Sequence, residues 1–305
     1  MRFGINILNF GPGTGPESLA RWAGFAEEVG YHLIMISDHV AVTPDVQDGF
    51  PAPFYDPFVS LSWLANIATR VELGTTVIIL PYRHPLLTAR LAANIDNLSG
   101  GRFILGTGVG WAKQEFAALG VPFGKRGVLA DEYLEVIRLC WANEVVSYEG
   151  QFVSFKDVHT GPRPLRPAGL PIWVGGSSDA AIKRAVRFGD AWHPYRFTLE
   201  WLKDEALPKQ RRLAEAEGKP VPAFCPRFSL QLTDETLPEG QRRPGHGSIE
   251  QIHADLKVFA SLGAEYILLD TYTGLPGQTE QPEEDWKILA MIADQVLDLP
   301  NETVR

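Results

Sequence analysis

The chain has 305 residues, of which 45% are hydrophobic and 21% are charged, a composition typical of a globular protein with a large apolar core. Its formal net charge of -9 at pH 7 argues against nucleic acid and anionic membrane surfaces as partners. The sequence has no apolar run long enough to span a bilayer, and it starts with a strand-like segment rather than a signal peptide.

The first half of the chain alternates apolar strand-like runs with segments of helical spacing. After the first strand, Leu19, Trp22 and Val29 recur on one helix face, and Gly30 is placed to end that helix. The run 33–37 is apolar on both faces, as buried parallel strands are. The expected strands are 3–8, 33–37, 71–77 and 103–107, the later helices are 56–68, 85–98 and one around 132–141, and 108–124 is a long loop.

The second half keeps this alternation but carries two interruptions. Residues 145–155 indicate a β-hairpin, and residues 233–247 form an irregular insert. Ser248 and Gln251 have the spacing of a capping box at the start of the clearest helix. The expected strands are 171–174, 190–193, 228–232 and 266–270, and the expected helices are 180–188, 200–217, 249–262 and 285–296.

Strands that alternate with helices eight times predict an α/β fold, a parallel sheet closed into a (β/α)8 TIM barrel. We expect a single domain over residues 1–305, with the hairpin before strand five and the insert after strand seven as additions to the barrel. Barrel enzymes place function at the C-terminal ends of their strands, so candidate residues are sought there.

The fifth expected strand ends in Gly175, Gly176, Ser177 and Ser178, directly before a helix. Glycines let the backbone approach a ligand, and the N–H groups at a helix N-terminus favour an anion. The same residues also fit an ordinary turn in which Ser177 or Ser178 caps the helix. Their place at a barrel mouth favours a phosphate site over a simple turn.

His39 follows the second expected strand and is the best candidate for a catalytic acid or base, because imidazole exchanges a proton near neutral pH. The alternative is a histidine that is hydrogen-bonded within the second loop. Neighbouring Asp38 is interpreted as a carboxylate that holds loop amides. Thr75, Thr76 and Val77 end the third strand at the same rim.

The fourth strand runs into a glycine-rich segment suited to a planar ligand. Gly108 and Gly110 let the backbone approach such a ligand, and Trp111 is placed either to stack on it or to plug the mouth. Charged residues near this rim offer cations to an anionic ligand, although each separately is more often a solvated surface residue. They are Lys113 with Glu115 in this loop, and Arg83, His84 and Arg90 after the third strand.

The sequence shows neither a metal site nor a covalent hydrolase motif. HxH, HExxH and paired-carboxylate spacings are absent, and so is GxSxG. Cys140 and Cys225 are far apart and in dissimilar contexts, so we expect neither a disulfide framework nor a cysteine metal cluster. This favours a cytoplasmic protein that acts on a small molecule.

Several segments together resemble the bacterial-luciferase-like family of flavin- and deazaflavin-dependent oxidoreductases. The resemblance covers nearly the whole chain, and residues 108–111 with Glu115 and Phe116 look most like the branch that uses a deazaflavin. The segments are Ser37-Asp38-His39, Leu73-Gly74-Thr75-Thr76-Val77, Ser99-Gly100-Gly101-Arg102-Phe103, Gly106-Thr107-Gly108 and the run from Gly161 through Ile172 to Ser177.

The resemblance implies a barrel that holds an isoalloxazine-like ring at its mouth, with the phosphate at the turn 175–177. The residues expected to bind this cofactor are Asp38, Thr75, Thr76, Val77, Gly108, Gly110, Trp111, Gly175, Gly176, Ser177 and Ser178. The resemblance also implies a non-proline cis peptide bond between Thr76 and Val77 that bulges toward the ring. In related deazaflavin enzymes the histidine that matches His39 lies near the reactive ring carbon. A homodimer is a further implication.

We therefore predict an oxidoreductase that exchanges hydride between a deazaflavin, coenzyme F420, and a small organic substrate, with His39 moving the proton. The alternatives are a reduced-FMN monooxygenase of the same family, a barrel lyase or isomerase acting on a phosphorylated sugar, and a non-catalytic cofactor-binding barrel. The family's sugar-phosphate dehydrogenases carry glutamate where this chain has Val109, which argues against a sugar-phosphate substrate. Glu115 lies too far along the chain to be taken as the replacement.

Overall fold

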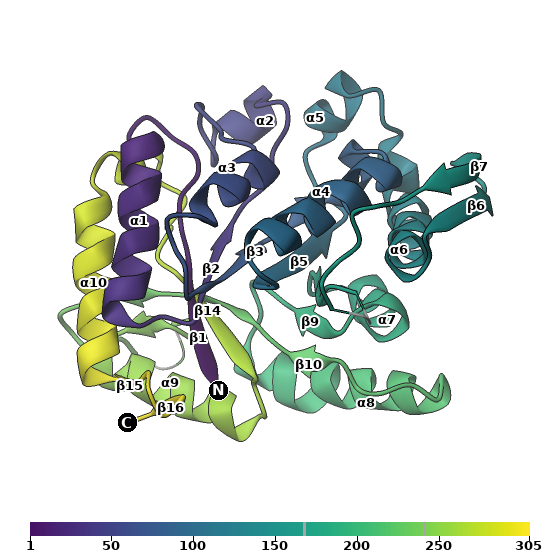
Figure 1. Cartoon of the computed structure of the whole chain (residues 1–305). Helices are drawn as coiled ribbons and strands as arrows, with labels where there is room; N and C mark the ends of the chain where they lie inside the picture. Colours follow the sequence, from purple (N-terminus) through teal and green to yellow (C-terminus); the bar gives the residue numbers. More distant parts are fainter. Residues whose placement is uncertain (167–168, 239, 241) are drawn as a thin grey trace.

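The computed structural model, which describes residues 1–166, 169–238, 240 and 242–305, has the predicted (β/α)8 barrel architecture (Figure 1). The strands of the barrel pair in parallel throughout. They are β1 (Arg2–Asn6), β2 (Leu33–Ile36), β3 (Glu72–Thr75), β5 (Phe103–Gly108), β8 (Ile172–Gly175), β9 (Ala191–His193), β10 (Ala223–Phe224), β11 (Arg227–Ser229) and β14 (Tyr266–Asp270).

Two short strands together fill the seventh position and close the barrel. β10 pairs with β9 on one side, and β11 pairs with β14 on the other. The two residues between them continue the ladder, since Cys225 N–H donates to the Trp192 carbonyl at 2.9 Å and the Pro226 carbonyl accepts from Leu268 N–H at 3.0 Å. The expected strand 228–232 is therefore shifted, because the barrel strand starts at Ala223.

Side chains along the strands alternate between the barrel interior and the layer beneath the helices. In β2, Leu33 and Met35 belong to one buried cluster together with Leu268, whereas Ile34 and Ile36 belong to the larger cluster that includes the helices. Both faces of the strand are thus buried. This explains why the strand runs are apolar throughout rather than alternating.

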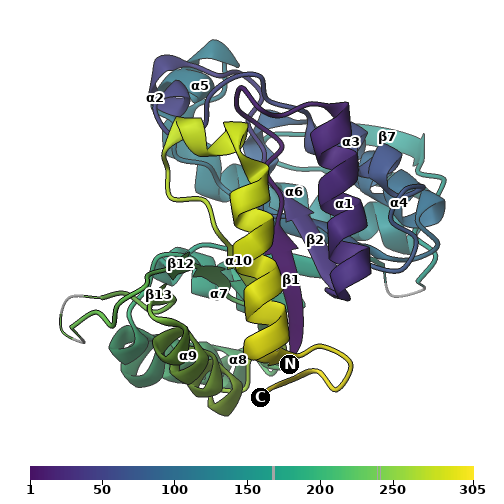
Figure 2. The same cartoon turned by 90° about the vertical axis from the view of Figure 1, so that its left-hand side faces the viewer.

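A ring of helices covers the barrel, and the first and last of them lie side by side (Figures 1 and 2). The Met1 amino group donates to the Glu302 carbonyl at 2.7 Å, so the two chain ends are neighbours. The helices are α1 (Pro16–Val29), α3 (Pro57–Leu64), α4 (Pro85–Leu98), α6 (Arg126–Ala142), α7 (Asp179–Phe188), α8 (Leu207–Ala216), α9 (Ile249–Ser261) and α10 (Pro282–Gln295).

Local signals set the helix ends as expected. Gly30 follows α1 with a φ of 96°, the left-handed region that favours glycine. At the start of α9, the backbone N–H of Ser248 donates to Gln251 Oε1 at 3.2 Å, which is one half of the predicted capping box. α4 covers the predicted range 85–98.

The loops at the barrel mouth contain more structure than expected. The expected strand 71–77 stops at Thr75 and resumes as β4 (Ile78–Ile79), which pairs with β5. The expected loop 108–124 contains α5 (Lys113–Ala118), and α5 lies beside α2 (Pro44–Gln47) from the loop after β2 in both views (Figures 1 and 2). Such helical turns are too short to leave a periodic apolar pattern in the sequence.

The remaining short elements lie outside the barrel. The expected helix 200–217 begins with the π-helical turn η3 (Trp201–Ala206), next to Pro208, which lacks the N–H of a regular helix. The predicted hairpin, β6 (Val145–Glu149) and β7 (Ser154–His159), projects from the barrel (Figure 1). The others are β12 (Gln231–Leu232), β13 (His246–Gly247), β15 (Leu297–Asp298), β16 (Thr303–Val304), η1 (Leu80–Tyr82), η2 (Phe123–Lys125) and η5 (Pro276–Glu280).

The expected insert 233–247 is bounded by a parallel pair, β12 with β13, and its residues 239 and 241 lie outside the described residues. Among the helices that the structure describes, none is both long and apolar enough to cross a membrane.

Candidate active site

A cavity of about 550 Å³ opens at the C-terminal ends of the barrel strands. Sites for small organic ligands commonly have this volume. Residues predicted from sequence line much of it: Asp38, His39, Thr76, Val77, Gly108, Gly110, Trp111, Gly175 and Gly176.

His39 lies just after β2, and its buried imidazole lines the cavity. Its Nδ1 is 2.6 Å from Oε2 of Glu115. Because a carboxylate can only accept, Nδ1 carries the hydrogen and donates it. Within the described part of the chain Nε2 has no hydrogen-bond partner, so Nε2 is the ring nitrogen left to meet a ligand.

Glu115 is fully buried and organises the loop around His39. Its Oε1 accepts from the backbone N–H groups of Val40 at 2.6 Å and Ala41 at 3.0 Å, and Oε2 accepts from the Tyr82 hydroxyl at 3.0 Å. Burial raises the pKa of Glu115, but the hydrogen bonds from His39 and from the two backbone N–H donors outweigh burial and leave the pKa below its ordinary value. Glu115 is thus an ionised carboxylate that fixes the orientation of His39.

Asp38 and Arg83 form an ion pair whose two side chains are both buried. Arg83 donates Nη1 to Oδ2 at 2.7 Å and Nη2 to Oδ1 at 2.8 Å, while the Ile79 N–H donates to Oδ2 at 2.8 Å. Arg83 also contacts Asp56 at 2.8 Å. Burial lowers the pKa of Arg83, but the two carboxylates raise it by more, so the guanidinium stays charged. Asp38 therefore ties the segment after β2 to the segment after β4.

The peptide bond between Thr76 and Val77 is cis, as the family resemblance implies. Val77 fits between two glycines of the cavity wall. A Cβ added to Gly108 would lie 2.5 Å from Cγ2 of Val77, and one added to Gly175 would lie 2.8 Å from Cγ1. Neither distance is tolerated between carbon atoms, so glycine at both positions makes room for the Val77 side chain.

His193 and Arg227 belong to a network of buried hydrogen bonds that holds Thr76 in place. His193 Nδ1–H donates to the Cys225 carbonyl at 2.5 Å, so its Nε2 accepts from the Thr76 hydroxyl at 2.9 Å. Arg227 donates to the Thr76 carbonyl at 3.1 Å and binds Asp270 at 2.8 Å. The ends of β3, β9, β11 and β14 are thereby joined at the floor of the cavity.

The burial of His193 predicts a specific loss of stability in acid. Burial and the nearby Arg227 charge lower the pKa of His193 to about 4, although its bond to the Cys225 carbonyl raises it. Between pH 6.5 and 4 the unfolded chain therefore binds a proton that the folded chain does not, and stability falls with pH. The free energy of unfolding is expected to fall by roughly 3 kcal/mol through this histidine once the pH has dropped to 4. Above pH 6.5 this histidine causes no loss of stability.

Urea denaturation at pH 7.5 and pH 4.5 measures this effect by comparing wild type with His193→Asn, which cannot titrate but keeps a donor for the Cys225 carbonyl. We expect His193→Asn to lose less stability over this interval than wild type. Equal losses in the two proteins would show that His193 is not held neutral.

The glycine-serine turn after β8 caps a helix, as one of its two predicted roles requires, and its phosphate-binding role stays a prediction. Gly176 has a φ of 114° and lines the cavity. Ser178 caps α7 by accepting from Ala181 N–H at 3.2 Å, and the Ser177 hydroxyl donates to the Tyr195 carbonyl at 2.6 Å. The backbone N–H groups of both serines have no partner among the residues described, which leaves them for an anion.

Aromatic side chains surround His39 on the loop side. The ring centroids of Phe50, Phe54 and Trp111 lie 5.2, 5.5 and 5.8 Å from that of His39. Tyr272, which follows β14, lies 6.0 Å from Phe50. Trp111 is 51% exposed and forms the outer edge of this aromatic wall. The wall therefore offers an apolar surface next to Nε2 of His39.

Two sequence expectations about this site are wrong, since Glu115 and Arg83 are buried rather than solvated. Each is held by several partners that lie far away in the sequence, which local patterns do not reveal. Thr75 is also fully buried and does not line the cavity. Its hydroxyl donates to the Gly106 carbonyl at 2.7 Å, so Thr75 connects β3 to β5. His193 was missed as a site residue, although it ends β9 and so carries the signal that pointed to His39. Arg227 was missed because it begins β11, inside the divided seventh strand, where no strand-end signal marks it.

The fold and the site define a (β/α)8-barrel enzyme with a ligand cavity at the C-terminal ends of its strands. The sequence of residues 1–235 matches the family described as luciferase-like monooxygenases. The chain belongs to this family.

Two relatives and one solved structure illustrate the match. An uncharacterized protein of Mycobacterium tuberculosis is 33% identical over 258 residues, which cover 81% of this chain and 87% of that one. An F420-dependent glucose-6-phosphate dehydrogenase of Amycolatopsis mediterranei is 31% identical over 227 residues, 72% of this chain and 66% of that one. The coenzyme F420 dependent tetrahydromethanopterin reductase of Methanopyrus kandleri has the same fold, with a TM-score of 0.78, 18% identity and 99% of both chains covered.

The family and its F420-dependent members make this chain an oxidoreductase of the flavin- and deazaflavin-dependent class. The family and these relatives support a flavin or a deazaflavin as its cofactor.

Proposed function

We propose that this enzyme transfers a hydride between coenzyme F420 and a small organic substrate, with His39 moving the accompanying proton. The observation that carries the proposal is the pair His39–Glu115, in which Glu115 holds Nδ1 and leaves Nε2 of a cavity-lining imidazole without a hydrogen-bond partner among the described residues. The relatives named for F420 dependence support the choice of cofactor.

The residues of the cavity fit a ring system with a phosphate tail. Val77 presents its side chain between Gly108 and Gly175, where it would support one face of a flat ring. The N–H groups of Ser177 and Ser178 would hold the phosphate at the start of α7. When bound, the deazaflavin supplies the carbon that accepts or gives up the hydride.

The chemistry left to the chain is proton transfer and positioning. Nδ1–H of His39 is committed to Glu115, so Nε2 accepts a proton from a substrate hydroxyl, or returns one in the reverse direction. The ionised Glu115 stabilises the imidazolium that forms. The aromatic wall excludes water from this edge of the imidazole.

A reduced-FMN monooxygenase is the second candidate, because the family description names monooxygenases. Oxygen uptake separates the two, since a deazaflavin has carbon in place of the ring nitrogen that reacts with oxygen. We expect a substrate-dependent change in F420 absorbance without oxygen uptake when alcohols, ketones and enoates are screened. Substrate-dependent oxygen consumption with FMN alone would overturn the proposal.

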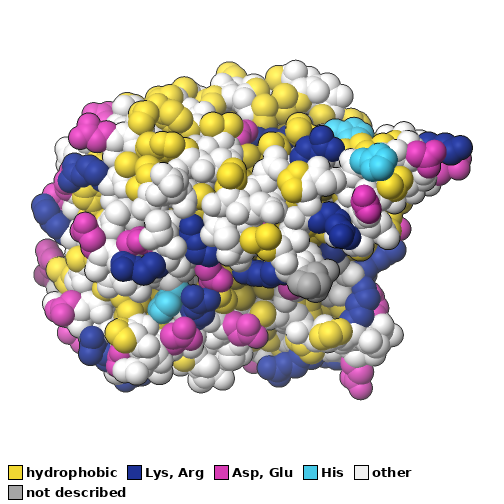
Figure 3. All heavy atoms as spheres, viewed as in Figure 1, with side chains coloured by type: hydrophobic (Ala, Val, Ile, Leu, Met, Phe, Trp, Pro, Cys, Tyr) yellow, Lys and Arg dark blue, Asp and Glu magenta, His cyan; other side chains and the backbone are white. Residues whose placement is uncertain are grey.

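We further propose that the single barrel domain forms a homodimer through α3 and α4. Val59, Trp63 and Ile67 form an exposed apolar stripe on and just after α3, and Leu87 and Leu98 extend it on α4. Figure 3 shows hydrophobic side chains gathered on this face, over the position of α3 in Figure 1. A second copy would cover this surface.

Trp63→Glu tests this interface, because a buried charge at its centre is costly. Light scattering after size exclusion is expected to show a dimer for wild type and a monomer for the variant. A wild-type monomer at micromolar concentration would exclude the interface.

A cytoplasmic location is also part of the proposal. Both cysteines are free and buried, and burial raises the pKa of Cys140 to about 11, so neither is a reactive thiol.

A further inference from the structure

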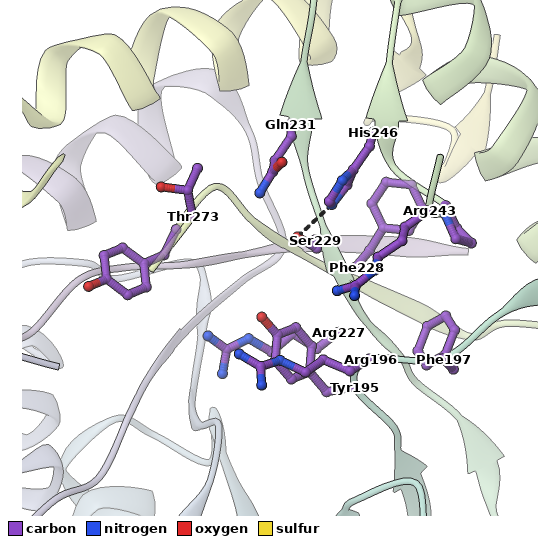
Figure 4. Close-up of a pocket in the computed structure, with 12 residues that line it drawn as sticks. Tyr195, Arg196, Phe197, Arg227, Phe228, Ser229, Gln231, Arg243, His246 and Thr273 are labelled. Carbon is purple, nitrogen blue, oxygen red and sulfur yellow. Dashed lines mark hydrogen bonds between the residues drawn. The ribbon is translucent and has the colours of Figure 1, made fainter. Parts of the chain in front are cut away.

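A second, smaller cavity of about 100 Å³ adjoins the main one. Five residues line both: Tyr195, Arg196, Arg227, Tyr272 and Thr273. Figure 4 shows this side pocket, with Arg196 and Arg227 on one side and Gln231 and His246 on the other. The two cavities therefore adjoin along these five residues, close enough for one ligand to contact both.

The side pocket gathers positive charge in a chain whose net charge is -9. Arg196, Arg227 and Arg243 line it, and its described lining contains no carboxylate. Arg227 is paired with Asp270. Within the described residues, the guanidinium groups of Arg196 and Arg243 have no ion pair and no hydrogen bond, so their charge is available to a ligand.

Two further features suit an anion here. Arg196 has a φ of 58°, a conformation that is uncommon outside glycine and often marks functional loops. His246 Nε2 is 3.1 Å from the Ser229 hydroxyl, and the Gln231 amide lies beside them (Figure 4). These groups add neutral hydrogen-bond donors to the two arginines.

The main cavity next to His39 has the opposite character, because Phe50, Trp111 and Tyr272 make its wall apolar. Tyr272 belongs to both cavities and marks the passage between them. The two adjoining cavities are thus apolar beside His39 and cationic beyond Tyr272.

We propose that the substrate is an amphipathic organic anion, whose apolar part lies on the aromatic wall beside His39 and whose carboxylate or phosphate binds Arg196 and Arg243. This inference rests on the proposed function for the place of the reaction. It assigns Arg196 and Arg243 as residues that determine substrate specificity.

Binding of a matched pair of probes tests the assignment without turnover. 2-Naphthoate carries an apolar body and a carboxylate, and 2-naphthamide is its neutral counterpart. Calorimetry on cofactor-saturated protein is expected to show 2-naphthoate binding about tenfold more tightly than 2-naphthamide, because charge-assisted hydrogen bonds to arginine are strong. Arg196→Ala/Arg243→Ala should abolish this preference.

Arg211→Ala/Arg212→Ala is the matched control, since it removes the same charge from exposed positions on α8. It should leave the preference unchanged. Equal affinity of wild type for both probes, or an unchanged preference in Arg196→Ala/Arg243→Ala, would overturn the inference.

A further experiment asks whether the anion in the side pocket belongs to the substrate or to the cofactor. It measures how tightly Arg196→Ala/Arg243→Ala binds F420 and the deazaflavin that lacks the phosphate tail. If the variant bound only F420 more weakly and kept its preference for 2-naphthoate, the side pocket would hold the cofactor and the inference would be wrong. The probes can also be titrated into cofactor-free protein. A failure of F420 to bind is therefore distinguishable from a failure of the anion site.

Discussion

Replacing His39 by alanine is expected to lower kcat/KM by about 100- to 10,000-fold, the usual contribution of a positioned proton-transfer group. The reason is geometric, since Glu115 holds Nδ1 of His39 at 2.6 Å and thereby leaves Nε2 of this cavity-lining imidazole for a ligand. The affinity for the cofactor should change little, because the proposed phosphate contacts lie at the start of α7. Stopped-flow hydride transfer and fluorescence titration measure the two effects separately.

His159→Ala is the matched control, because His159 is exposed on β7 and away from the cavity. It should keep full activity. Glu115→Gln is expected to keep the fold but to shift the pH dependence of the rate, since the neutral amide no longer stabilises the imidazolium. Unchanged turnover in His39→Ala would remove His39 from the reaction.

The largest effect on stability is expected from Asp38→Ala, which leaves the buried Arg83 guanidinium without its main partner. Breaking a buried ion pair in this way costs about 3–5 kcal/mol. The midpoint of urea denaturation should fall accordingly. Because Asp38 also accepts from the Ile79 N–H, the segment that carries the cis bond Thr76–Val77 is expected to loosen as well.

A double variant keeps this prediction testable if Asp38→Ala is too unstable to purify. In Asp38→Ala/Arg83→Met no unpaired guanidinium remains, so part of the lost stability should return. Glu284→Ala, which breaks an exposed pair with Lys287 on α10, should change the midpoint little. A stable Asp38→Ala with weakened cofactor binding would instead support a direct cofactor role for Asp38.

The fold was predictable because most elements carry their own local signal. The apolar run 266–270 and the helix 85–98 appear in the structure with the predicted bounds. The seventh strand was harder to place, since its assigned pairing changes from β9 to β14 at Cys225 and Pro226, and its apolar run continues into β12 outside the barrel. A strand that consists of two short segments, each paired on a different side, has no single apolar run that marks its bounds in the sequence.

The candidate site was predictable only where position alone identifies a residue. His39 and the turn at Gly175 follow directly from the ends of their strands. The burial of Glu115 was not predictable, because it depends on α5 bringing residue 115 against residue 39, 76 positions away in sequence. The hydrogen bonds of Arg227 were not predictable for the same reason, since they join Thr76 and Asp270, which only the fold brings together.

The proposal of F420 as cofactor is tested most directly by fluorescence titration of the purified protein with F420 and with FMN. We expect F420 to bind with a dissociation constant in the micromolar range or below, and FMN to bind at least about tenfold more weakly. Tight binding of FMN together with no response to F420 would contradict the account.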